Sequence, residues 1–583
     1  MQTRVRRRTN LPVDALTQTQ LPELLKRVYA NRGVTDPAHL EMSIQHIHSP
    51  ELLKGINQAV ELIFEAIKQS KAIVIVGDYD ADGATSTALA MRGLSGLGAQ
   101  NLSYLVPNRF KFGYGLTPEI VDLCQKRGSK LIITVDNGIS SLSGAQRARD
   151  LKIDVLVTDH HLPGTEIPNA NAIVNPNQPG DDFPSKALAG VGVMFYVLIA
   201  LRSRLREQQW FDEQNIPEPN FAELLDLVAL GTVADVVPLD RNNRIFVEQG
   251  LRRIRAGKCC SGILALLQVA NCNYQRTVSS DLAFYVGPRI NAAGRLEDMS
   301  IGIECLLANN LKTANELAVK LHSLNSERRE IETQMRDEAL KSLESLEQQS
   351  SIDRQQNNIG ICIYQNDWHQ GVVGILAARI KEKFHRPTIA FAKADADGEL
   401  KGSARSISGV HIRDVLDSVA ARNPDLISKF GGHAMAAGLT LKETNFSLFT
   451  EAFNEVLSNW VSEEDLHAEI LSDGELSDHE LSLNTAQILR SSGPWGQAFP
   501  MPVFDGEFKV IDHRIVGEHH LKLTLQAVKG SNAIDAIAFN FQNYDWHNRA
   551  DIIHAAYELD VNYYRGIESA QMMIRHLIVK TTH

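Results

Sequence analysis

The first third of the chain repeats one pattern: a short, mostly apolar run, then a polar segment, then a helical stretch. The apolar runs have the length of strands and lie at Lys71–Val76, Leu131–Val135 and Val155–Thr158. The pattern after the first run predicts a helix at Ala84–Leu97. Continuous apolar runs are typical of strands that are buried on both faces of a parallel sheet, and the helices between them supply the crossovers. The pattern therefore predicts an α/β fold with a doubly wound, mostly parallel sheet.

The rest of the chain predicts a long connection and two further domains. Leu311 to about Gln349 is charged, has a helical pattern and contains no Gly or Pro, which indicates one long helix. Alternating β patterns after about Glu469 indicate a small β-barrel. The predicted ranges are an N-terminal segment 1–50, a first α/β domain 51–310, a connecting helix 311–350, a second α/β domain 351–460 and a barrel 465–583.

Composition limits the classes of function. The net charge is −11, so a general basic field for nucleic acid is absent and any site for a polyanion has to be local. The six cysteines form no CxxC pair, which fits a reducing cytoplasm. The longest apolar run, Ala187–Leu201, is shorter than the ~20 residues of a membrane helix and predicts a buried core helix.

Acidic and imidazole side chains directly follow the predicted elements. In chain order, the candidates are Asp78, Asp80 and Asp82 after the first strand, then Asp136, then Asp159, His160 and His161, and finally Asp235 after the apolar run Leu224–Leu230. Ligands of open α/β sheets bind at the carboxyl ends of the strands. We therefore expect these side chains to share one crevice.

Carboxylates gathered in one crevice would repel one another and take up protons unless cations lay between them. Carboxylate and imidazole ligands without a thiolate suit Mn²⁺ or Mg²⁺. Two such ions about 4 Å apart would activate a water and stabilise the oxygens of an in-line displacement at phosphorus. The sequence thus predicts a two-metal phosphoesterase site.

Each motif taken alone has a simpler interpretation. The Asp-rich loop could bind Ca²⁺, but an EF-hand needs Glu at the twelfth position from Asp78, where this chain has Leu89. Asp136 alone could cap a helix or form a turn, and the triplet Asp159–His161 alone could be a solvated surface turn. Their combination at the ends of elements in one topology favours the metal site.

Together the motifs resemble the DHH phosphoesterase superfamily and, within it, the RecJ branch of single-strand exonucleases. The segments of the first α/β domain that carry this resemblance are Gly77–Leu89, Val106–Leu116, Thr134–Ile139, Thr158–His161, Gly231–Leu239 and Gly287–Leu296. Trp368–Ile380, Gly402–Ser406 and Gly431–Gly438 resemble the DHHA1 domain, and Gly493–Phe504 and Tyr563–Gly566 resemble the RecJ OB-fold. The resemblance covers nearly the whole chain after about residue 50.

The resemblance implies a DHH catalytic domain that a long helix joins to a DHHA1 domain, with a C-terminal OB-fold. It implies a metal-dependent 5′→3′ exonuclease that degrades single-stranded DNA by two-metal phosphodiester hydrolysis, in DNA repair and recombination. The implied cofactors are two Mn²⁺ or Mg²⁺ ions. Implied partners are single-stranded DNA, a single-strand-binding protein and a helicase, and we expect a cytoplasmic monomer without membrane association.

The resemblance also implies roles for individual residues. The implied metal ligands are Asp80, Asp82, Asp136, His160 and Asp235, with Asp136 between the two ions. The implied catalytic set is Asp136, Asp159, His160 and His161, in which His161 contacts the phosphate. Asp78 and Asp159 would orient the ligands without touching the ions. Many members of the superfamily have a histidine where this chain has Val76, so we expect one ion to have fewer protein ligands here.

A second group matches positions that contact phosphate or DNA in the family. It consists of Arg109, Tyr114, Arg289, Asn291, Ser403, Arg405 and His433. Guanidinium groups bind phosphate bidentately, and glycines let backbone N–H groups approach an oxygen. Two members keep a second interpretation: Tyr114 either stacks on a base or packs within its loop, and Asn291 either binds phosphate or caps a turn.

Two other functions have to be separated from this one. A DHH phosphodiesterase that acts on short oligonucleotides or cyclic dinucleotides needs only the two α/β domains, so the added barrel argues against it. A DNA-binding scaffold that has lost its metals is disfavoured because all five implied metal ligands are present together.

Overall fold

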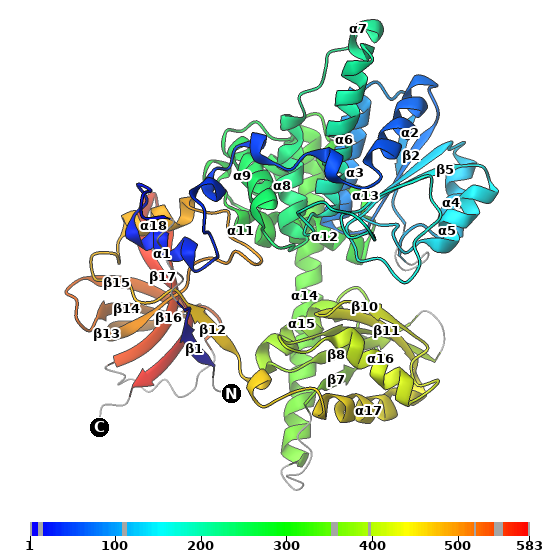
Figure 1. Cartoon of the computed structure of the whole chain (residues 1–583). Helices are drawn as coiled ribbons and strands as arrows, with labels where there is room; N and C mark the ends of the chain where they lie inside the picture. Colours follow the sequence, from blue (N-terminus) through cyan, green and yellow to red (C-terminus); the bar gives the residue numbers. More distant parts are fainter. Residues whose placement is uncertain are drawn as a thin grey trace. The chain divides into compact units, whose positions relative to one another are not determined.

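The first predicted sheet is present, and all of its strands are parallel (Figure 1). Its order is β3-β2-β4-β5-β6, with the bounds β2 Ile73–Gly77, β3 Leu102–Leu105, β4 Leu131–Val135, β5 Asp154–Thr158 and β6 Ala172–Val174. The chain leaves β2 in one direction to form β3 and then crosses to the other side to form β4. This reversal between β2 and β4 is the place where open α/β sheets bind ligands.

The computed structural model describes residues 3–9, 16–107, 114–350, 359–394, 398–517, 520–541 and 552–580. In that part of the chain, no helix is both long enough and apolar enough to cross a membrane. The apolar run at 187–201 lies mostly in helix α6 (Gly190–Glu207), whose first half is buried. The prediction of a core helix is confirmed.

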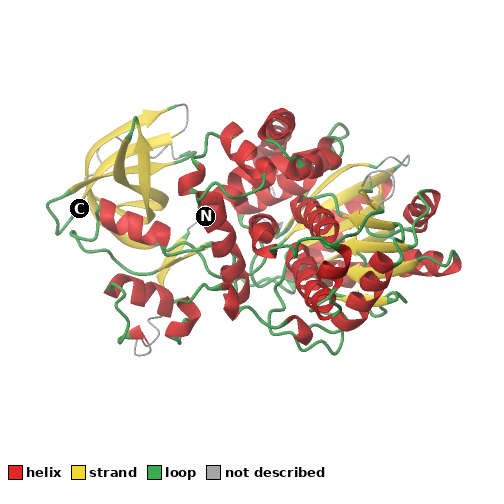
Figure 2. Cartoon of the chain, turned by 90° about the horizontal axis from the view of Figure 1, so that it is seen from above, coloured by secondary structure: helices red, strands yellow, loops and turns green. Residues whose placement is uncertain are grey.

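Helices cover both faces of the first sheet, which explains why its strands read as apolar runs (Figure 2). Side chains of Ile73 and Ile75 pack in the cluster formed with α2 (Ile56–Lys68), α3 (Ala81–Gly96) and α6. Val74 and Val76 pack on the other face with α4 (Pro118–Lys126) and α5 (Leu142–Asp150). The doubly wound fold is therefore confirmed.

Further helices complete this part of the molecule. They are α1 Glu23–Ala30, α7 Trp210–Gln214, α8 Leu225–Ala234, α9 Arg241–Arg255, α10 Ser261–Val269, α11 Ser279–Asp281, the π-helix η7 Leu282–Val286, α12 Gly287–Leu296 and α13 Ser300–Leu307. α8 packs between α3, α6 and α9. This packing brings the end of α8 to the carboxyl edge of the sheet.

The long connecting helix is α14 (Leu311–Ser350), and it leads into the second sheet. That sheet has the order β10-β11-β9-β8-β7, in which only β7 and β8 are parallel. Its strands are β7 Ile361–Tyr364, β8 Thr388–Lys393, β9 Glu399–Arg405, β10 Lys429–Gly432 and β11 Ala436–Lys442, and its helices are α15 Val373–Phe384, α16 Ile412–Arg422 and α17 Phe446–Ser458. The sequence also predicts a turn near 348–358, but residues 348–350 still belong to α14, and residues 351–358 are outside the described ranges.

The C-terminal strands form a closed barrel in the order β13-β14-β15-β17-β16, as predicted. The bounds are β13 Phe504–Val516, β14 His520–Ala527, β15 Ala533–Ala538, β16 Ile552–Tyr564 and β17 Ile567–Lys580, and α18 (Leu483–Ser491) packs against β16. Alternate residues of β14 are buried, so Leu521, Leu523 and Leu525 fill the interior. This alternation is the pattern that indicated a barrel in the sequence.

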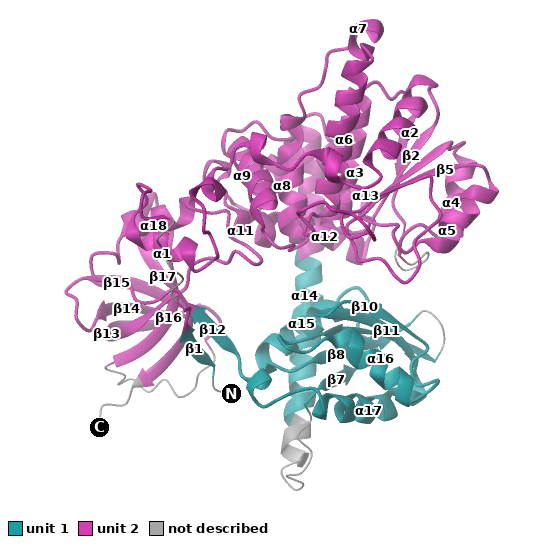
Figure 3. Cartoon of the chain, in the orientation of Figure 1, with its two compact units in different colours: residues 1–6, 326–471 teal, residues 7–325, 472–583 magenta. Residues whose placement is uncertain are grey.

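The described chain forms two compact units (Figure 3). One contains Ser326–Leu471 with the N-terminal residues up to Arg6, and the other contains Arg7–Asn325 and Ser472–His583. The barrel and the first sheet thus share a unit. Within it, Ser279 Oγ donates to the carbonyl of Trp495 at 2.6 Å, and the Tyr29 hydroxyl donates to the carbonyl of Ser492 at 2.8 Å. The domain boundaries predicted from the sequence stay a prediction.

The buried carboxylate of Asp505 joins Arg7, near the N-terminus, to the barrel. Arg7 donates to both oxygens of Asp505 at 2.9 Å, Ser472 Oγ donates to Oδ1 at 2.5 Å, and His554 Nε2 lies 3.2 Å from Oδ2. Burial alone would raise the pKa of Asp505. The hydrogen bonds from Arg7 and Ser472 and the charge of Arg7 outweigh burial and hold the pKa below its usual value.

We predict that Asp505→Asn lowers the midpoint of thermal unfolding at about pH 7. Because the folded-state pKa of Asp505 lies below the unfolded value of about 3.9, its charge stabilises the fold above that pH, and this contribution is lost as pH falls through the folded-state pKa. The difference in Tm between wild type and variant, followed by circular dichroism, should therefore shrink below about pH 4. Asp512→Asn, an exposed change on the same strand, is the control. A difference that stays constant across this range would contradict the assignment.

Candidate active site

The Asp-rich loop is the turn between β2 and α3. The helix begins at Ala81 rather than at the predicted Ala84, because Asp80 is its N-cap: Asp80 Oδ1 accepts the N–H of Gly83 at 3.0 Å. Asp82 follows in the first turn and is almost completely buried. Acidic side chains are favourable at a helix N-terminus. The same residues therefore start the helix and supply candidate metal ligands.

The N-terminus of α6 also contacts Asp82. The N–H groups of Gly190 and Val191 donate to its two carboxylate oxygens at 2.6 and 3.0 Å. Burial, and then the charge of Asp80, raise the pKa of Asp82 to about 7, while the two N–H groups oppose this rise. The sequence interpretation missed these backbone donors. The glycines at 190 and 192 were the available signal, since glycine permits close approach of the backbone.

Asp136 follows β4 in a left-handed backbone conformation, with a φ of 61°. Residues with a side chain rarely adopt this conformation, and where they do the site is often functional. The carboxylate is buried, and the backbone of Gly190 lies against it: a Cβ at position 190 would come within 2.6 Å of the Cβ of Asp136. The neighbouring helix therefore requires glycine at that point.

His160 brings three carboxylates to one imidazole nitrogen. Its Nε2 lies 3.0 Å from Asp136 Oδ1, 3.5 Å from Asp235 Oδ2 and 3.9 Å from Asp82 Oδ2. Asp235 is the C-cap of α8, so the side chains around His160 come from β4, β5, α3 and α8. Residues far apart in the sequence thus meet at one point, as the strand-end argument predicts.

Asp159 is fully buried and holds the loop after β5 in place. Its Oδ1 accepts the N–H of His160 at 2.7 Å and lies 2.7 Å from Nδ1 of His161, and its Oδ2 accepts the N–H of Ile139 at 2.8 Å. Burial would raise the pKa of Asp159, but the hydrogen bond and charge of His161 lower it. Burial would likewise lower the pKa of His161, but Asp159 raises it to about 9.

Two asparagines that the sequence interpretation missed hold the same loop from outside. Asn177 Nδ2 donates to the carbonyl of His160 at 2.6 Å, and Asn175 Nδ2 donates to the carbonyl of His161 at 2.9 Å. Both lie just after β6, the edge strand. Backbone carbonyls as partners leave no pattern in the sequence, so only the asparagines themselves could have drawn attention.

Burial and neighbouring charges disfavour the ionised forms of Asp136 and Asp235. Burial first, and then the negative charges of Asp82 and Asp80, raise the pKa values of Asp136 and Asp235 well above the usual range. Apart from the approach of His160, neither oxygen of Asp136 accepts a hydrogen bond from the described residues. A buried carboxylate with this surrounding is suited to a cation.

The described chain contains three sets of potential metal ligands, and within each set the ligand atoms lie within 4.8 Å of one another. They are Asp136, His160 and His161; Asp82, His160 and Asp235; and Asp78, Asp80 and Asp136. All five implied metal ligands belong to these sets, and Asp78 and His161 join them. The donors are carboxylate oxygens and imidazole nitrogens with no cysteine, which is the chemistry that suits Mn²⁺ or Mg²⁺. Val76, in the core of the sheet, offers no ligand.

Tyr114 lies beside the catalytic candidates. Its hydroxyl is 3.2 Å from His161 Nδ1 and donates to the carbonyl of Asp136 at 3.4 Å, and its ring meets Tyr79 edge-on. The residue is nevertheless 44% exposed, so part of its surface remains accessible. Arg109, the other candidate from this segment, lies outside the described residues.

α12 carries the two candidates Arg289 and Asn291, which contact different parts of the unit. Arg289 is buried and donates to the carbonyl of Tyr285 at 2.6 Å and to His322 Nδ1 at 3.2 Å. Asn291 Oδ1 accepts the N–H of Ala81 at 2.7 Å. Of the two interpretations of Asn291, the structure therefore contains the cap.

The candidates of the second α/β domain lie in the other unit. Arg405 ends β9, and its guanidinium donates to Ser403 Oγ at 3.1 Å and to the carbonyl of Ala404 at 2.8 Å. The N-terminus of α15 lies against this pair, because a Cβ on Gly374 would come within 3.0 Å of both side chains. His433 lies in the turn between β10 and β11, where its N–H donates to the carbonyl of Ala436 at 2.8 Å.

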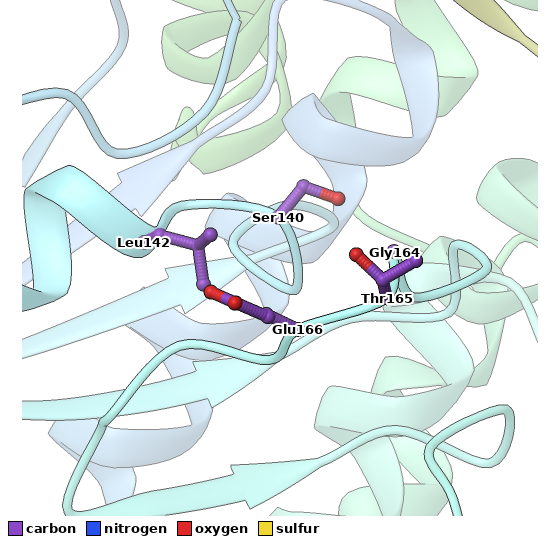
Figure 4. Close-up of a pocket in the computed structure, with 5 residues that line it drawn as sticks. All are labelled: Ser140, Leu142, Gly164, Thr165 and Glu166. Atoms are coloured by element: carbon purple, nitrogen blue, oxygen red, sulfur yellow. The ribbon is translucent and has the colours of Figure 1, made fainter.

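A pocket lies near the triplet, between the start of α5 and the loop that follows His161 (Figure 4). Its lining residues are Ser140, Leu142, Gly164, Thr165 and Glu166. None of them belongs to the sets of ligand atoms. The pocket is therefore separate from the candidate metal ligands.

Three family models match successive parts of the chain. The DHH family N-terminal domain matches residues 72–232, the DHHA1 domain matches 357–459, and the RecJ OB domain matches 472–576. Each match falls inside the range predicted for the corresponding domain. The first match contains the Asp-rich loop, Asp136 and the triplet Asp159–His161, whereas Asp235 follows it.

Whole proteins of the same organisation are also similar. The single-stranded-DNA-specific exonuclease RecJ of Salmonella typhimurium is 53% identical over 574 residues, covering 98% of this chain and 99% of the relative, and that of Escherichia coli is 53% identical with 98% of each covered. The crystal structure of RecJ in complex with Mn²⁺ from Thermus thermophilus superposes with a TM-score of 0.80 at 28% identity, over 99% of this chain and 80% of that one. The chain belongs to the RecJ family of single-stranded-DNA-specific exonucleases.

Proposed function

We propose that this chain degrades single-stranded DNA from the 5′ end by hydrolysing phosphodiester bonds with two divalent cations. The observation that carries the proposal is the meeting of Asp82, Asp136 and Asp235 around His160 Nε2, within 3.0 to 3.9 Å. Membership of the RecJ family supports the substrate class, and the solved relatives in complex with Mn²⁺ and with Mg²⁺ support the choice of ion.

The cations would be held by Asp80, Asp82, Asp136, His160 and Asp235. Asp136 and His160 each belong to two of the three sets of ligand atoms. We assign Asp136 between the two ions because a carboxylate has two oxygens that can bind two ions, whereas one imidazole nitrogen binds a single ion. Bound Mn²⁺ or Mg²⁺ would supply an activated water and neutralise charge on the phosphate oxygens. Asp159 would orient the two histidines by accepting the N–H groups of His160 and His161, and it would fix the ring of His161 through Nδ1. We assign phosphate contact to His161 and a positioning role to Asp78.

The second α/β domain would grip the DNA backbone. Arg405 is half-buried, burial lowers its pKa, and no carboxylate lies within ion-pair distance of it among the described residues. Such a guanidinium is suited to an anion from outside the protein, and the N-terminus of α15 beside it favours the same charge. We therefore assign phosphate binding to Arg405 and Ser403, and extend it to Arg109, Arg289 and His433 on resemblance alone. Tyr114 would stack on a base.

The cellular setting is part of the proposal. All six cysteines are free, which supports the reducing cytoplasm, and the resemblance supports a monomer that acts in repair and recombination beside a single-strand-binding protein and a helicase. Binding of those two partners stays a prediction.

The alternative substrate is a short oligonucleotide or cyclic dinucleotide. The barrel supports the long strand, since OB-folds bind oligonucleotides and a small substrate needs no such surface. A length series of single strands separates the two. An affinity that stops rising beyond a few nucleotides would defeat the long-strand proposal.

Asp136→Asn should abolish activity, because the amide keeps the volume of the side chain but removes the charge that two ions would share. We expect the rate to fall by more than the ~100-fold that is typical of residues that merely orient ligands. Mn²⁺ bound per chain, counted by electron paramagnetic resonance, should fall with it. The control is Asp154→Asn at the opposite end of β5, where the carboxylate only accepts from Asn171. An unchanged rate in Asp136→Asn would remove the metal mechanism.

Strands labelled at one end test the polarity. Label at the 5′ end should appear first, as a mononucleotide, while 3′ label stays on long products until late in the reaction. EDTA should stop both. Earlier release of the 3′ label would reverse the proposed direction.

Arg405→Met should raise KM for single-stranded DNA about tenfold and change kcat less, because the lost charge-assisted hydrogen bonds to phosphate are worth about 1.5–3 kcal/mol. Since Arg405 has no carboxylate partner in the described chain, Tm should not fall. Arg413→Met, an exposed change on α16, is the matched control. Equal KM values for Arg405→Met and wild type would contradict the assignment.

A further inference from the structure

α12 contacts the Asp-rich loop through the side chain of Asn291. The acceptor is Asn291 Oδ1, the donor is the N–H of Ala81, and they lie 2.7 Å apart. Ala81 is the first residue of α3, so this N–H has no acceptor inside its own helix. In the sequence it stands between Asp80 and Asp82, two of the assigned metal ligands.

A second contact from the same helix lies on the other side of Asp80. The backbone of Gly294 is so close to the loop that a Cβ there would fall 2.0 Å from the carbonyl oxygen of Tyr79. Residues 291 and 294 are three apart in α12 and share a face. One face of α12 thus contacts the residues that flank Asp80, at Tyr79 and at Ala81.

Asn291 and Asp80 accept different N–H groups at the start of α3. Asp80 Oδ1 already accepts the N–H of Gly83 as the N-cap. An N-cap side chain accepts the second or third N–H of its helix, so the first N–H, that of Ala81, needs an acceptor from elsewhere, and Asn291 supplies it. Together the two hydrogen bonds fix the side chain of Asp80 and the backbone that follows it.

We propose that Asn291 is a positioning residue of the metal centre, which sets the backbone between Asp80 and Asp82 and thereby the affinity for the divalent ion. The inference rests on the proposed function and deepens it. The hydrogen bond to Ala81 uses only the amide oxygen of Asn291, whereas a phosphate would be bound by the amide N–H groups, so the positioning role adds to the phosphate contact that the resemblance implies.

The test measures Mn²⁺ binding to the full chain without DNA, by calorimetry, and hydrogen exchange of the Ala81 amide. Asn291→Leu keeps the size of the side chain, suits a helix and removes the acceptor. It should weaken Mn²⁺ binding by about 10- to 100-fold, the usual effect of losing a group that orients a ligand, and should speed exchange at Ala81. Asn291→Asp keeps an acceptor, so it should retain the protection of Ala81 and bind Mn²⁺ more tightly than Asn291→Leu does.

The matched control is Asn310→Leu, which removes a similar cap, since Asn310 Oδ1 accepts the N–H of Thr313 at the start of α14 at 2.9 Å. It should leave Mn²⁺ binding unchanged. If Asn291→Leu failed to fold, Asn291→Ala would take its place, because alanine also lacks the acceptor and favours a helix.

Wild-type Mn²⁺ affinity and slow exchange at Ala81 in Asn291→Leu would overturn the inference. So would an Asn291→Asp variant that binds Mn²⁺ as weakly as Asn291→Leu, because the acceptor would then not be the relevant group. These results differ from a failure of the proposed function, in which wild type itself would bind no Mn²⁺.

Discussion

Repulsion among buried carboxylates is the constraint around which the crevice is organised. Asp82, Asp136 and Asp235 surround a single imidazole nitrogen, and burial raises the pKa of each. The fold offsets part of this cost with fixed dipoles, since the first N–H groups of α6 bind Asp82. What remains is negative charge that protein groups do not neutralise. A site of this kind is suited to cations, and this chemistry agrees with the membership of the chain in a nuclease family.

The topology explains why such a crowded arrangement can form at all. The reversal between β2 and β4 opens the sheet edge, and both strands are covered on each face, so the loops at their carboxyl ends rest on a rigid base. α6, α8 and α12 then approach these loops from outside the sheet. α6 brings two N–H groups to Asp82, α8 brings the carboxylate of Asp235, and α12 brings the amide oxygen of Asn291 to the N–H of Ala81. The parallel sheet gathers the acids, and the surrounding helices determine how each acid is held.

The sequence predicted the parts of this site that depend on strand ends. Asp136 and His160 follow apolar runs, and the rule for parallel sheets brings those ends together without any knowledge of contacts. It could not predict the donors to Asp82, because they are backbone N–H groups of Gly190 and Val191 and have no side-chain signature. For Asn291 the residue was identified but its partner was not, since one sequence does not tell where an amide points.

The same reasoning explains the errors at larger scale. The start of α3 was placed late because an N-terminal turn built from aspartates reads as a loop. That the barrel shares a unit with the first sheet was not predicted, since buried contacts such as Ser279 with Trp495 join positions far apart in the chain. The close approach of Gly190 to Asp136 has a further consequence for anyone who maps this protein by exhaustive mutagenesis. Position 190 should tolerate no other amino acid and would score as essential, although it carries no reactive atom: its role is to be empty where a strained aspartate needs room.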